Sequence, residues 1–174
     1  DPDRSTNYTI QAFRSNGTCV GIDAARTNEI FESYLESDSP EPFGDWGKWE
    51  REVTHGSSQL DFHFPNSSPP AWVEVKSLSS RTDGGVAFFS GTPSKRGYRH
   101  LEHLGDLAEE GCEARCVFVV QRSDVDRLKE AEVTQEDWME ALRRADDRGV
   151  TIMAYRCEFT GDGWRIEQEI SALL

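Results

Sequence analysis

Alternation of apolar and polar residues with a period of two predicts most strands of this chain, because successive side chains of a strand point to opposite faces. An early hairpin is predicted across residues 8–23, where two alternating runs flank Asn16 and Gly17, a pair typical of a type I′ turn. Residues 116–120 are continuously apolar, which predicts a central strand buried on both faces. The other predicted strands cover residues 48–54, 58–64, 71–77, 150–159 and 164–170.

Three helices are predicted from apolar residues that recur with a period near 3.6. The first covers residues 28–35, and the second starts after Ser94, covers residues 95–110 and is stopped by Gly111. The third covers residues 134–148 and is closed by Gly149. Helices interleaved with strands in this order predict an α/β fold in which a mixed central sheet is flanked by helices.

The length of 174 residues fits one domain with a hydrophobic core of its own, so residues 1–174 are interpreted as a single unit. No stretch approaches the ~20 apolar residues of a membrane span, and the first residues lack the basic-then-apolar order of a signal peptide. A cytoplasmic protein that does not enter the membrane is therefore expected. Four scattered cysteines do not suggest a disulfide scaffold.

The charge is strongly acidic, with 32 Asp and Glu against 19 Lys and Arg, a formal net charge of -13. Fifteen of the basic residues are Arg and only four are Lys, a bias that resembles adaptation to a salt-rich cytoplasm. Such a charge argues against a nucleic-acid partner only if it is evenly spread. Between Lys76 and His100 there are five basic residues and one acidic residue, so a local phosphate-binding strip remains compatible with the composition.

Two adjacent predicted strands carry the strongest candidate chemistry. Asp61 lies on residues 58–64, opposite in direction to Leu60 and Phe62, while Glu74 and Lys76 share one face of residues 71–77. If these strands pair, two carboxylates and an amine meet on one face. Mg²⁺ or Mn²⁺ takes one or two carboxylates while keeping waters for a phosphate substrate.

This spacing resembles the PD-(D/E)XK nuclease signature, in which an Asp is followed by Glu-x-Lys inside a strand. Asp61 and Glu74 are then the expected metal ligands together with the Val75 carbonyl, and Lys76 is expected to orient or help deprotonate the attacking water. The alternative is a solvated strand edge with ordinary cross-strand ion pairs. Apolar neighbours of Glu74 favour the functional interpretation, because unpaired charge is costly among them.

Several short strings, taken in order, are similar to the sugar fermentation stimulation (SfsA) proteins. They are Glu52-Val53, Gly56-x-Ser58-x-Leu60-Asp61-Phe62, Trp72-Val73-Glu74-Val75-Lys76, Lys95-Arg96-Gly97-x-Arg99-His100-Leu101, Glu110-Gly111, Phe118-Val119-Val120-Gln121-Arg122 and Gly149-Val150. The resemblance extends from about residue 8 to the end of the chain. It implies a restriction-endonuclease-like (PD-(D/E)XK) core, DNA binding and a metal-dependent nuclease site at Asp61, Glu74 and Lys76 that hydrolyses phosphodiester bonds. A DNA-binding regulatory protein that does not cut is the alternative.

The chain departs from the pattern of that family in three places. An OB-like barrel normally precedes this region, so a separate OB-like domain is expected as a partner. Gln59 stands where the family usually has Arg, and Ser90-Gly91-Thr92 replaces a Pro-Asp-Ala string. These differences leave the expected metal ligands unchanged, but they put DNA binding and catalytic activity in question.

Further candidates surround the cluster. Glu32, on the first predicted helix, is the expected third metal ligand, although an exposed helical glutamate is the alternative. Arg96 and His100, four residues apart, share a helical face and are expected to contact phosphate, with Lys95 and Arg99 beside them. Gln121, at the end of the buried strand, is expected either to contact nucleic acid or to cap that strand.

Overall fold

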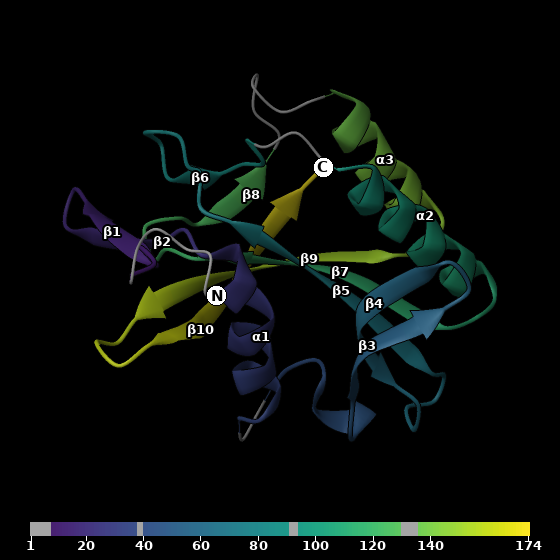
Figure 1. Cartoon of the computed structure of the whole chain (residues 1–174). Helices are drawn as coiled ribbons and strands as arrows, with labels where there is room; N and C mark the ends of the chain where they lie inside the picture. The colour runs from purple at the N-terminus through teal and green to yellow at the C-terminus, as the bar shows by residue number, and fades with distance from the viewer. Residues whose placement is uncertain (1–7, 38–39, 91–93, 130–135) are drawn as a thin grey trace.

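The computed structural model describes residues 8–37, 40–90, 94–129 and 136–174 and contains ten strands and three α-helices in these ranges (Figure 1). The strands are β1 (Ala12–Ser15), β2 (Thr18–Gly21), β3 (Glu50–His55), β4 (Ser58–Phe64), β5 (Ala71–Leu78), β6 (Val86–Ala87), β7 (Glu113–Val120), β8 (Arg127–Lys129), β9 (Thr151–Phe159) and β10 (Trp164–Leu173). The helices are α1 (Thr27–Leu35), α2 (Lys95–Glu109) and α3 (Glu136–Asp147), with the short 3-10 helices η1 (Ala24–Arg26) and η2 (Gly44–Trp46).

Eight strands form one mixed sheet in the order β3-β4-β5-β7-β9-β10-β8-β6. Strands β3, β4 and β5 form an antiparallel meander. Strand β7 then pairs in parallel with β5, and β9 pairs in parallel with β7. Strand β10 returns antiparallel to β9. The helix α2 lies in the connection that leads to β7, and α3 lies in the connection that leads to β9, as parallel pairing requires. This arrangement confirms the predicted α/β fold with a mixed central sheet.

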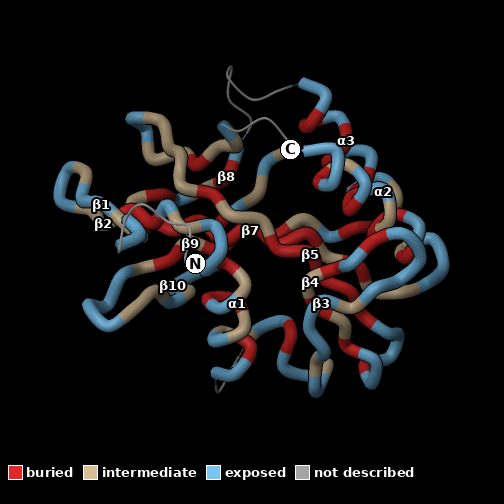
Figure 2. The backbone as a smooth tube through the Cα atoms, viewed as in Figure 1, coloured by how far each residue is buried: buried red, intermediate tan, exposed pale blue. Residues whose placement is uncertain are grey.

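Two hydrophobic clusters cover the two faces of the sheet (Figure 2). The first contains Leu101 and Leu104 of α2 with Trp138 and Leu142 of α3. The second joins Ile30 and Phe31 of α1 to Phe43, Phe62 and Tyr155. The sheet is therefore the middle layer of three, and its central strands are buried as the apolar run at residues 116–120 predicts.

Most predicted boundaries agree with the structure to within a few residues. Asn16 and Gly17 have φ angles of 49° and 86°, which confirms the type I′ turn between β1 and β2. Ser94 caps α2 by accepting a hydrogen bond from the Gly97 N–H. Thr134, the expected start of the third helix, lies outside the described residues. The short strands β6 and β8 were not predicted, because two or three residues carry no detectable alternation.

Leu60 is an exception to the simple alternation expected for β4. It packs in the cluster that contains α2, while Phe62 and Phe64 pack in the cluster that contains α1. The β3–β4 ladder omits the facing residues Glu52 and Asp61 without any shift in register, and Glu52 has a φ angle of 54°. Regular pairing of the two strands is therefore interrupted at the position of β4 that holds Asp61.

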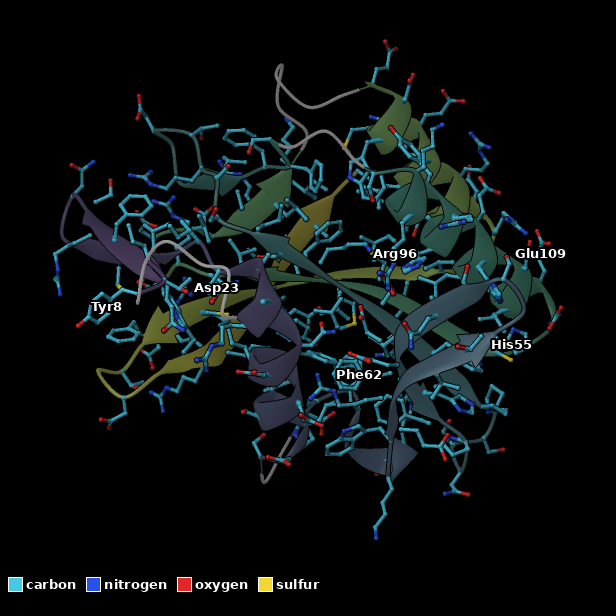
Figure 3. The ribbon with its side chains drawn as sticks, in the orientation of Figure 1. Tyr8, Asp23, His55, Phe62, Arg96 and Glu109 are labelled. Atoms are coloured by element: carbon cyan, nitrogen blue, oxygen red, sulfur yellow. The ribbon has the colours of Figure 1, made fainter. Side chains whose placement is uncertain are left out.

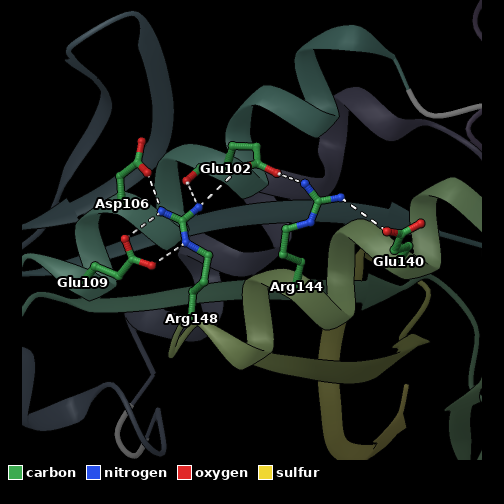
Figure 4. A network of polar contacts seen from close by, with 6 residues as sticks. All are labelled: Glu102, Asp106, Glu109, Glu140, Arg144 and Arg148. Carbon is green, nitrogen blue, oxygen red and sulfur yellow. Dashed lines mark hydrogen bonds and ion pairs between the residues drawn. The ribbon is translucent and has the colours of Figure 1, made fainter.

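An ionic clamp joins α2 to the end of α3 (Figure 4). The Arg148 guanidinium contacts Glu102, Asp106 and Glu109 of α2, with its Nη2 2.5 Å from Asp106 Oδ1. Arg144 contacts Glu102 and Glu140 nearby. Gly105 lies under the guanidinium, where an added Cβ would be 2.6 Å from Arg148 Nη1. Within the described residues, no helix has the length and apolar character needed to cross a membrane.

Candidate active site

Asp61 is placed by the point at which β4 and β5 separate. The ladder of these strands ends at the pair Phe62–Val73, and the Asp61 carboxylate takes the place of the next backbone acceptor. Its Oδ2 accepts the Val75 N–H at 2.8 Å, and its Oδ1 accepts Asn28 Nδ2 of α1 at 2.8 Å. Burial, and then the nearby Glu74, raise the pKa of Asp61 to about 6, although these two hydrogen bonds and Lys76 act in the opposite direction.

Glu74 is a buried carboxylate with one engaged and one unengaged oxygen. Its side chain is 3% exposed, and its Oε1 contacts both the Lys76 ammonium and His100 Nδ1, the latter at 2.5 Å. Burial raises the pKa of Glu74, but the bonds from His100 and Lys76 outweigh burial and leave it below the ordinary value. Its Oε2 is also buried and has no hydrogen-bond partner among the described residues. An unpaired buried carboxylate oxygen is costly unless a cation or a donor meets it.

His100 connects this carboxylate to Arg96. The imidazole accepts a hydrogen bond from Arg96 Nε at its Nε2 (3.2 Å), so its Nδ1 carries the proton that is donated to Glu74. His100 is 3% exposed and lies inside the molecule. His100 also lines the cavity described below, and its Nδ1 holds Glu74. Direct contact of His100 with phosphate stays a prediction.

These residues meet at a cavity of about 330 Å³ between β5 and the beginnings of α1 and α2. Asp61, Glu74, Val75 and Lys76 line it from the sheet, as the sequence predicts. Arg96 is an exposed residue on its wall, and Figure 3 shows its place on α2, near the middle of the molecule. The cavity therefore combines a carboxylate pair with two cationic side chains.

The structure does not bring Glu32 to this cavity. Its Oε1 accepts a hydrogen bond from Trp49 Nε1 at 3.2 Å, and its Oε2 forms an ion pair with Arg51 at 2.8 Å. Asn28, one helical turn earlier, is the residue of α1 that contacts Asp61. The predicted helix includes Asn28, but a neutral amide gave no signal for a role at a metal site. The signal that the sequence does offer is a polar side chain one turn before Glu32, on the same face of the helix.

The remaining predicted residues are dispersed around the cavity. Lys95 and Arg99 are exposed on the first turns of α2. Gln121 is buried, and its Nε2 donates to Ser77 Oγ at 3.0 Å, so Gln121 caps the end of β7 rather than lining this cavity. Gln59 is exposed and donates to the Glu52 carbonyl at 2.9 Å, beside the break in the β3–β4 ladder.

The donor set fits a hard divalent cation. Asp61 and Glu74 supply carboxylate oxygens, and the unpartnered Glu74 Oε2 is a buried anionic oxygen that lacks a positive neighbour of its own. Over the described ranges, no three side chains of His, Cys, Asp or Glu are grouped so that they could hold a metal ion. A cation here would thus take two carboxylates, a carbonyl such as that of Val75, and waters, the arrangement typical of Mg²⁺.

Comparison with known proteins identifies the relationship. The family model described as "Sugar fermentation stimulation protein RE domain" matches residues 25–163. The chain belongs to the sugar fermentation stimulation protein family. A homolog from Moorella thermoacetica is 40% identical over 156 residues, which cover 89% of this chain and 67% of the homolog. A homolog from Acetivibrio thermocellus is 34% identical over 166 residues, covering 95% of this chain and 71% of the homolog.

A solved structure of the sugar fermentation stimulation family agrees with the fold. It is described as Pyrococcus furiosus SfsA in complex with Ca²⁺, and it matches with a TM-score of 0.84 at 27% identity. The match covers 98% of this chain and 74% of the other chain. The agreement confirms the family predicted from the ordered strings and the α/β architecture of its members.

Proposed function

We propose that this chain is a Mg²⁺- or Mn²⁺-dependent nuclease that binds DNA and hydrolyses its phosphodiester bonds. The observation that carries the proposal is the buried, unpartnered Glu74 Oε2 beside Asp61, in a cavity that Lys76 and Arg96 also line. A carboxylate pair alone would be repulsive, which is the reason that Glu74 raises the pKa of Asp61. A divalent cation between them removes this repulsion. The Ca²⁺ named for the Pyrococcus furiosus relative is a hard cation of the same class.

The residues of this chain have distinct roles in the proposed reaction. Asp61 and Glu74 hold the cation, which when bound supplies positive charge to the phosphate oxygens. Asn28 and the Val75 N–H fix the direction of the Asp61 carboxylate. Lys76, held against Glu74, donates hydrogen bonds to the attacking water or to the phosphate, and so aligns the two.

Arg96 is the group placed to meet the charge that develops on the phosphate. Its guanidinium is exposed on the cavity wall, while its Nε is anchored to His100. An arginine held at one nitrogen keeps the others available for phosphate oxygens. His100 transmits this anchoring to Glu74, so the metal ligand and the phosphate contact are oriented by one hydrogen-bonded chain.

The experiment is a cleavage assay with labelled single- and double-stranded DNA in buffered KCl, with Mg²⁺, Mn²⁺ or EDTA. We expect cleavage with either metal and none in EDTA. Glu74→Gln and Lys76→Met should each lower the cleavage rate by about 10²-fold, with DNA binding in EDTA retained. Glu32→Gln is the matched control, because it removes a carboxylate that points away from the cavity.

The outcomes separate this proposal from its alternative. DNA that is bound but never cut, with either metal and either strand state, would instead support a regulatory protein that does not cut. Cleavage that survives Glu74→Gln would reject the assigned site. Circular dichroism of each variant confirms that a lost activity is not a lost fold.

A further inference from the structure

A second cavity, of about 440 Å³, lies on the other side of η1 and the first turn of α1 from the candidate active site. Thr27 and Asn28 line the active-site cavity, whereas Asp23 and Glu29 line the second one. In Figure 3, Asp23 and Arg96 accordingly appear on opposite sides of the N-terminal end of α1. One short helical segment is thus the common wall of both cavities. An α-helix with its side chains is ~10 Å across, so a ligand that spans the wall can occupy both.

Two aromatic rings form one side of the second cavity. Trp164 and Phe159 stand at the ends of β10 and β9, with ring centroids 5.5 Å apart. The Trp164 ring is packed over Gly21 of β2, where an added Cβ would lie 3.0 Å from Trp164 Cζ2, so the indole has a fixed position. Phe159 is 44% exposed. Exposed aromatic surface beside a cavity offers a flat ligand a surface on which to stack.

The polar lining of the cavity accepts more hydrogen bonds than it donates. Asp23, Glu29 and Asp162 contribute carboxylates, and Arg26 is the only Lys or Arg among the residues that line it. Arg26 already donates to Glu29 Oε2 at 3.0 Å. Gln121, on the floor, keeps a buried Oε1 without a hydrogen-bond partner among the described residues. The lining therefore favours a ligand with N–H groups and disfavours a phosphate.

We propose that this cavity receives an unstacked, amino-bearing nucleobase of the DNA strand that is cut at Asp61 and Glu74. The inference rests on the proposed function and adds to it a base-binding subsite. A flat heterocycle can stack on the aromatic side of the cavity, and its exocyclic amine can donate hydrogen bonds to the carboxylates. Asp and Glu recognise cytosine N4 by the same kind of hydrogen bond. A volume of about 440 Å³ is within the range of small-molecule sites, so a base with its sugar fits.

The proposal makes the substrate a strand with at least one base out of its stack. A base in a duplex is paired and stacked, and its extrusion costs a few kcal/mol. A single-stranded substrate avoids this cost. Thymine and uracil have a carbonyl oxygen in place of the exocyclic amine and offer only their ring N3–H, so strands made only of these bases present fewer donors to the carboxylates. The phosphates remain outside this cavity, because its carboxylates repel them, and pass on the side of Lys76 and Arg96.

The test measures nucleoside binding in EDTA by ligand-observed NMR, with two pairs in which one member carries an exocyclic amine and the other a carbonyl oxygen and a ring N–H: cytidine against uridine, and adenosine against inosine. We expect the amino member of each pair to bind about tenfold more tightly, the value of one good contact to a charged acceptor. Asp162→Asn, in an exposed turn, should reduce that preference. Phe159→Ala should weaken all four nucleosides by about fivefold or more through lost stacking. Glu36→Gln, an exposed position at the end of α1, is the matched control for the charge.

Binding that is equal within both pairs, or that is unchanged in Asp162→Asn and Phe159→Ala, overturns the inference. Failure of the proposed function gives a different pattern, because nucleosides are measured without metal. A protein that discriminates cytidine from uridine but cuts nothing contradicts the proposed nuclease and, with it, the assignment of the base to a cut strand. A protein that cuts DNA and binds no nucleoside refutes the base subsite alone.

Discussion

At the scale of single residues, the two carboxylates of the candidate site differ because their partners differ. Glu74 has the ammonium of Lys76 and the Nδ1–H of His100, which favour its charged form. Asp61 has only neutral donors within hydrogen-bond distance, the Val75 N–H and the Asn28 amide, and it faces Glu74. Asp61 is therefore the carboxylate of the site to which no cationic side chain donates a hydrogen bond among the described residues. A divalent ion would supply that positive contact.

The raised pKa of Asp61 predicts a pH-dependent cost to folding when metal is absent. The pKa of Asp61 is about 6 in the folded protein, whereas the ordinary pKa of an aspartate is 3.8. Between these values the folded state holds more protons than the unfolded state, so the free energy of unfolding falls as pH rises through the window and stays low above it. The Asp61→Asn variant has no ionisable group at this position, so its free energy of unfolding does not fall in this window. We expect the variant to exceed the wild type above pH 7 by about 1–3 kcal/mol, with the difference shrinking toward pH 4.

Urea unfolding in EDTA at pH values from 4 to 8 measures this difference. Asp45→Asn, at an exposed position in η2, is the control and should track the wild type throughout. A difference that does not vary with pH would show that Asp61 acts through packing or hydrogen bonds alone.

A second prediction concerns Asn28, the neutral residue of α1 that contacts Asp61. Asn28→Asp places a third carboxylate at the cavity and removes the donor to Asp61 Oδ1. In EDTA the variant should be less stable than the wild type by about 1–3 kcal/mol. Mn²⁺ should stabilise the variant more than it stabilises the wild type, because a third carboxylate should lower the Kd for the ion. A ligand that binds only the folded state raises the free energy of unfolding by an amount that grows with the logarithm of its concentration divided by Kd.

Thermal melts across a Mn²⁺ titration test this, with Glu32→Gln as the comparison. That substitution should cost less than about 1 kcal/mol, the value of a surface ion pair with Arg51, and should leave the Mn²⁺ dependence unchanged. If Mn²⁺ stabilises Glu32→Gln less than it stabilises the wild type, Glu32 would be supported as a metal ligand.

The sequence identifies Asp61, Glu74 and Lys76 because their positions on two strands follow from the period of two. It does not identify Asn28, nor the role of His100 as a donor to Glu74. Both depend on where α1 and α2 dock against the end of β5, and docking is set by contacts far apart in the sequence, such as Asn28 with Asp61. For the same reason, the sequence does not show that Glu32 contacts Trp49 and Arg51 while Asn28, one turn earlier, contacts Asp61.

At the scale of elements, one arginine adds an ionic clamp to the apolar packing of α2 against α3. Arg148 bridges three carboxylates of α2 and lies across Gly105, so the two helices approach closely at this point. Because α2 also carries Arg96 and His100, the clamp supports the wall of the active-site cavity from the opposite end of the helix. A lone surface ion pair contributes little, but a network around a half-buried guanidinium contributes more.

A double-mutant cycle between Gly105 and Arg148 tests the clamp. Arg148→Ala should lower the free energy of unfolding by about 1–2 kcal/mol. Gly105→Ala should displace the guanidinium, so Arg148→Ala should cost almost nothing in the Gly105→Ala background, a coupling of about 1 kcal/mol. Urea unfolding at low and high KCl measures the cycle, and salt should reduce the coupling. Arg144→Ala, at a more exposed arginine, should change stability by less than half as much; additive effects of Gly105→Ala and Arg148→Ala would refute the clamp.

Most elements that the sequence predicted are long enough to display a period, whereas the short strands β1 and β2 were indicated by the Asn16-Gly17 turn between them. Strands β4, β5 and β7 and helix α2 each repeat an apolar pattern over at least seven residues. Strands β6 and β8 do not, and they exist because they pair with each other and, through β8, with β10. Their partners are tertiary, so no local pattern could have revealed them.

At the scale of the whole molecule, an acidic surface and a phosphate substrate are compatible only if the positive field is local. Of the five basic residues between Lys76 and His100, Arg81 forms an ion pair with Asp124 at 2.9 Å, and Lys76 contacts Glu74. Lys95, Arg96 and Arg99 remain exposed on the first turns of α2. The positive field that would meet DNA is thus narrower than the sequence window suggests, and it is centred on one end of one helix.

Two charge reversals of equal size separate this local field from the net charge. Lys95→Glu and Lys48→Glu each change the formal net charge from -13 to -15, and both lysines are exposed. Lys95 begins α2 beside the cavity, whereas Lys48 lies between η2 and β3. Screening confines the effect of a surface charge to about 10 Å at 0.1 M salt, so only Lys95→Glu should weaken DNA binding, by about tenfold, and reduce the slope of log K against log salt by about 1.

Fluorescence anisotropy with labelled single-stranded DNA in EDTA, over a series of KCl concentrations, measures both quantities. Unchanged melting temperatures would show that the variants differ from the wild type in charge and not in fold. Equal weakening in the two variants would mean that the whole-molecule charge governs the encounter. In that case the first turns of α2 would not be the DNA-binding surface. A loss confined to Lys95→Glu would place the phosphate path along α2 and toward the carboxylates of Asp61 and Glu74, because the same helix carries Arg96 on the wall of their cavity.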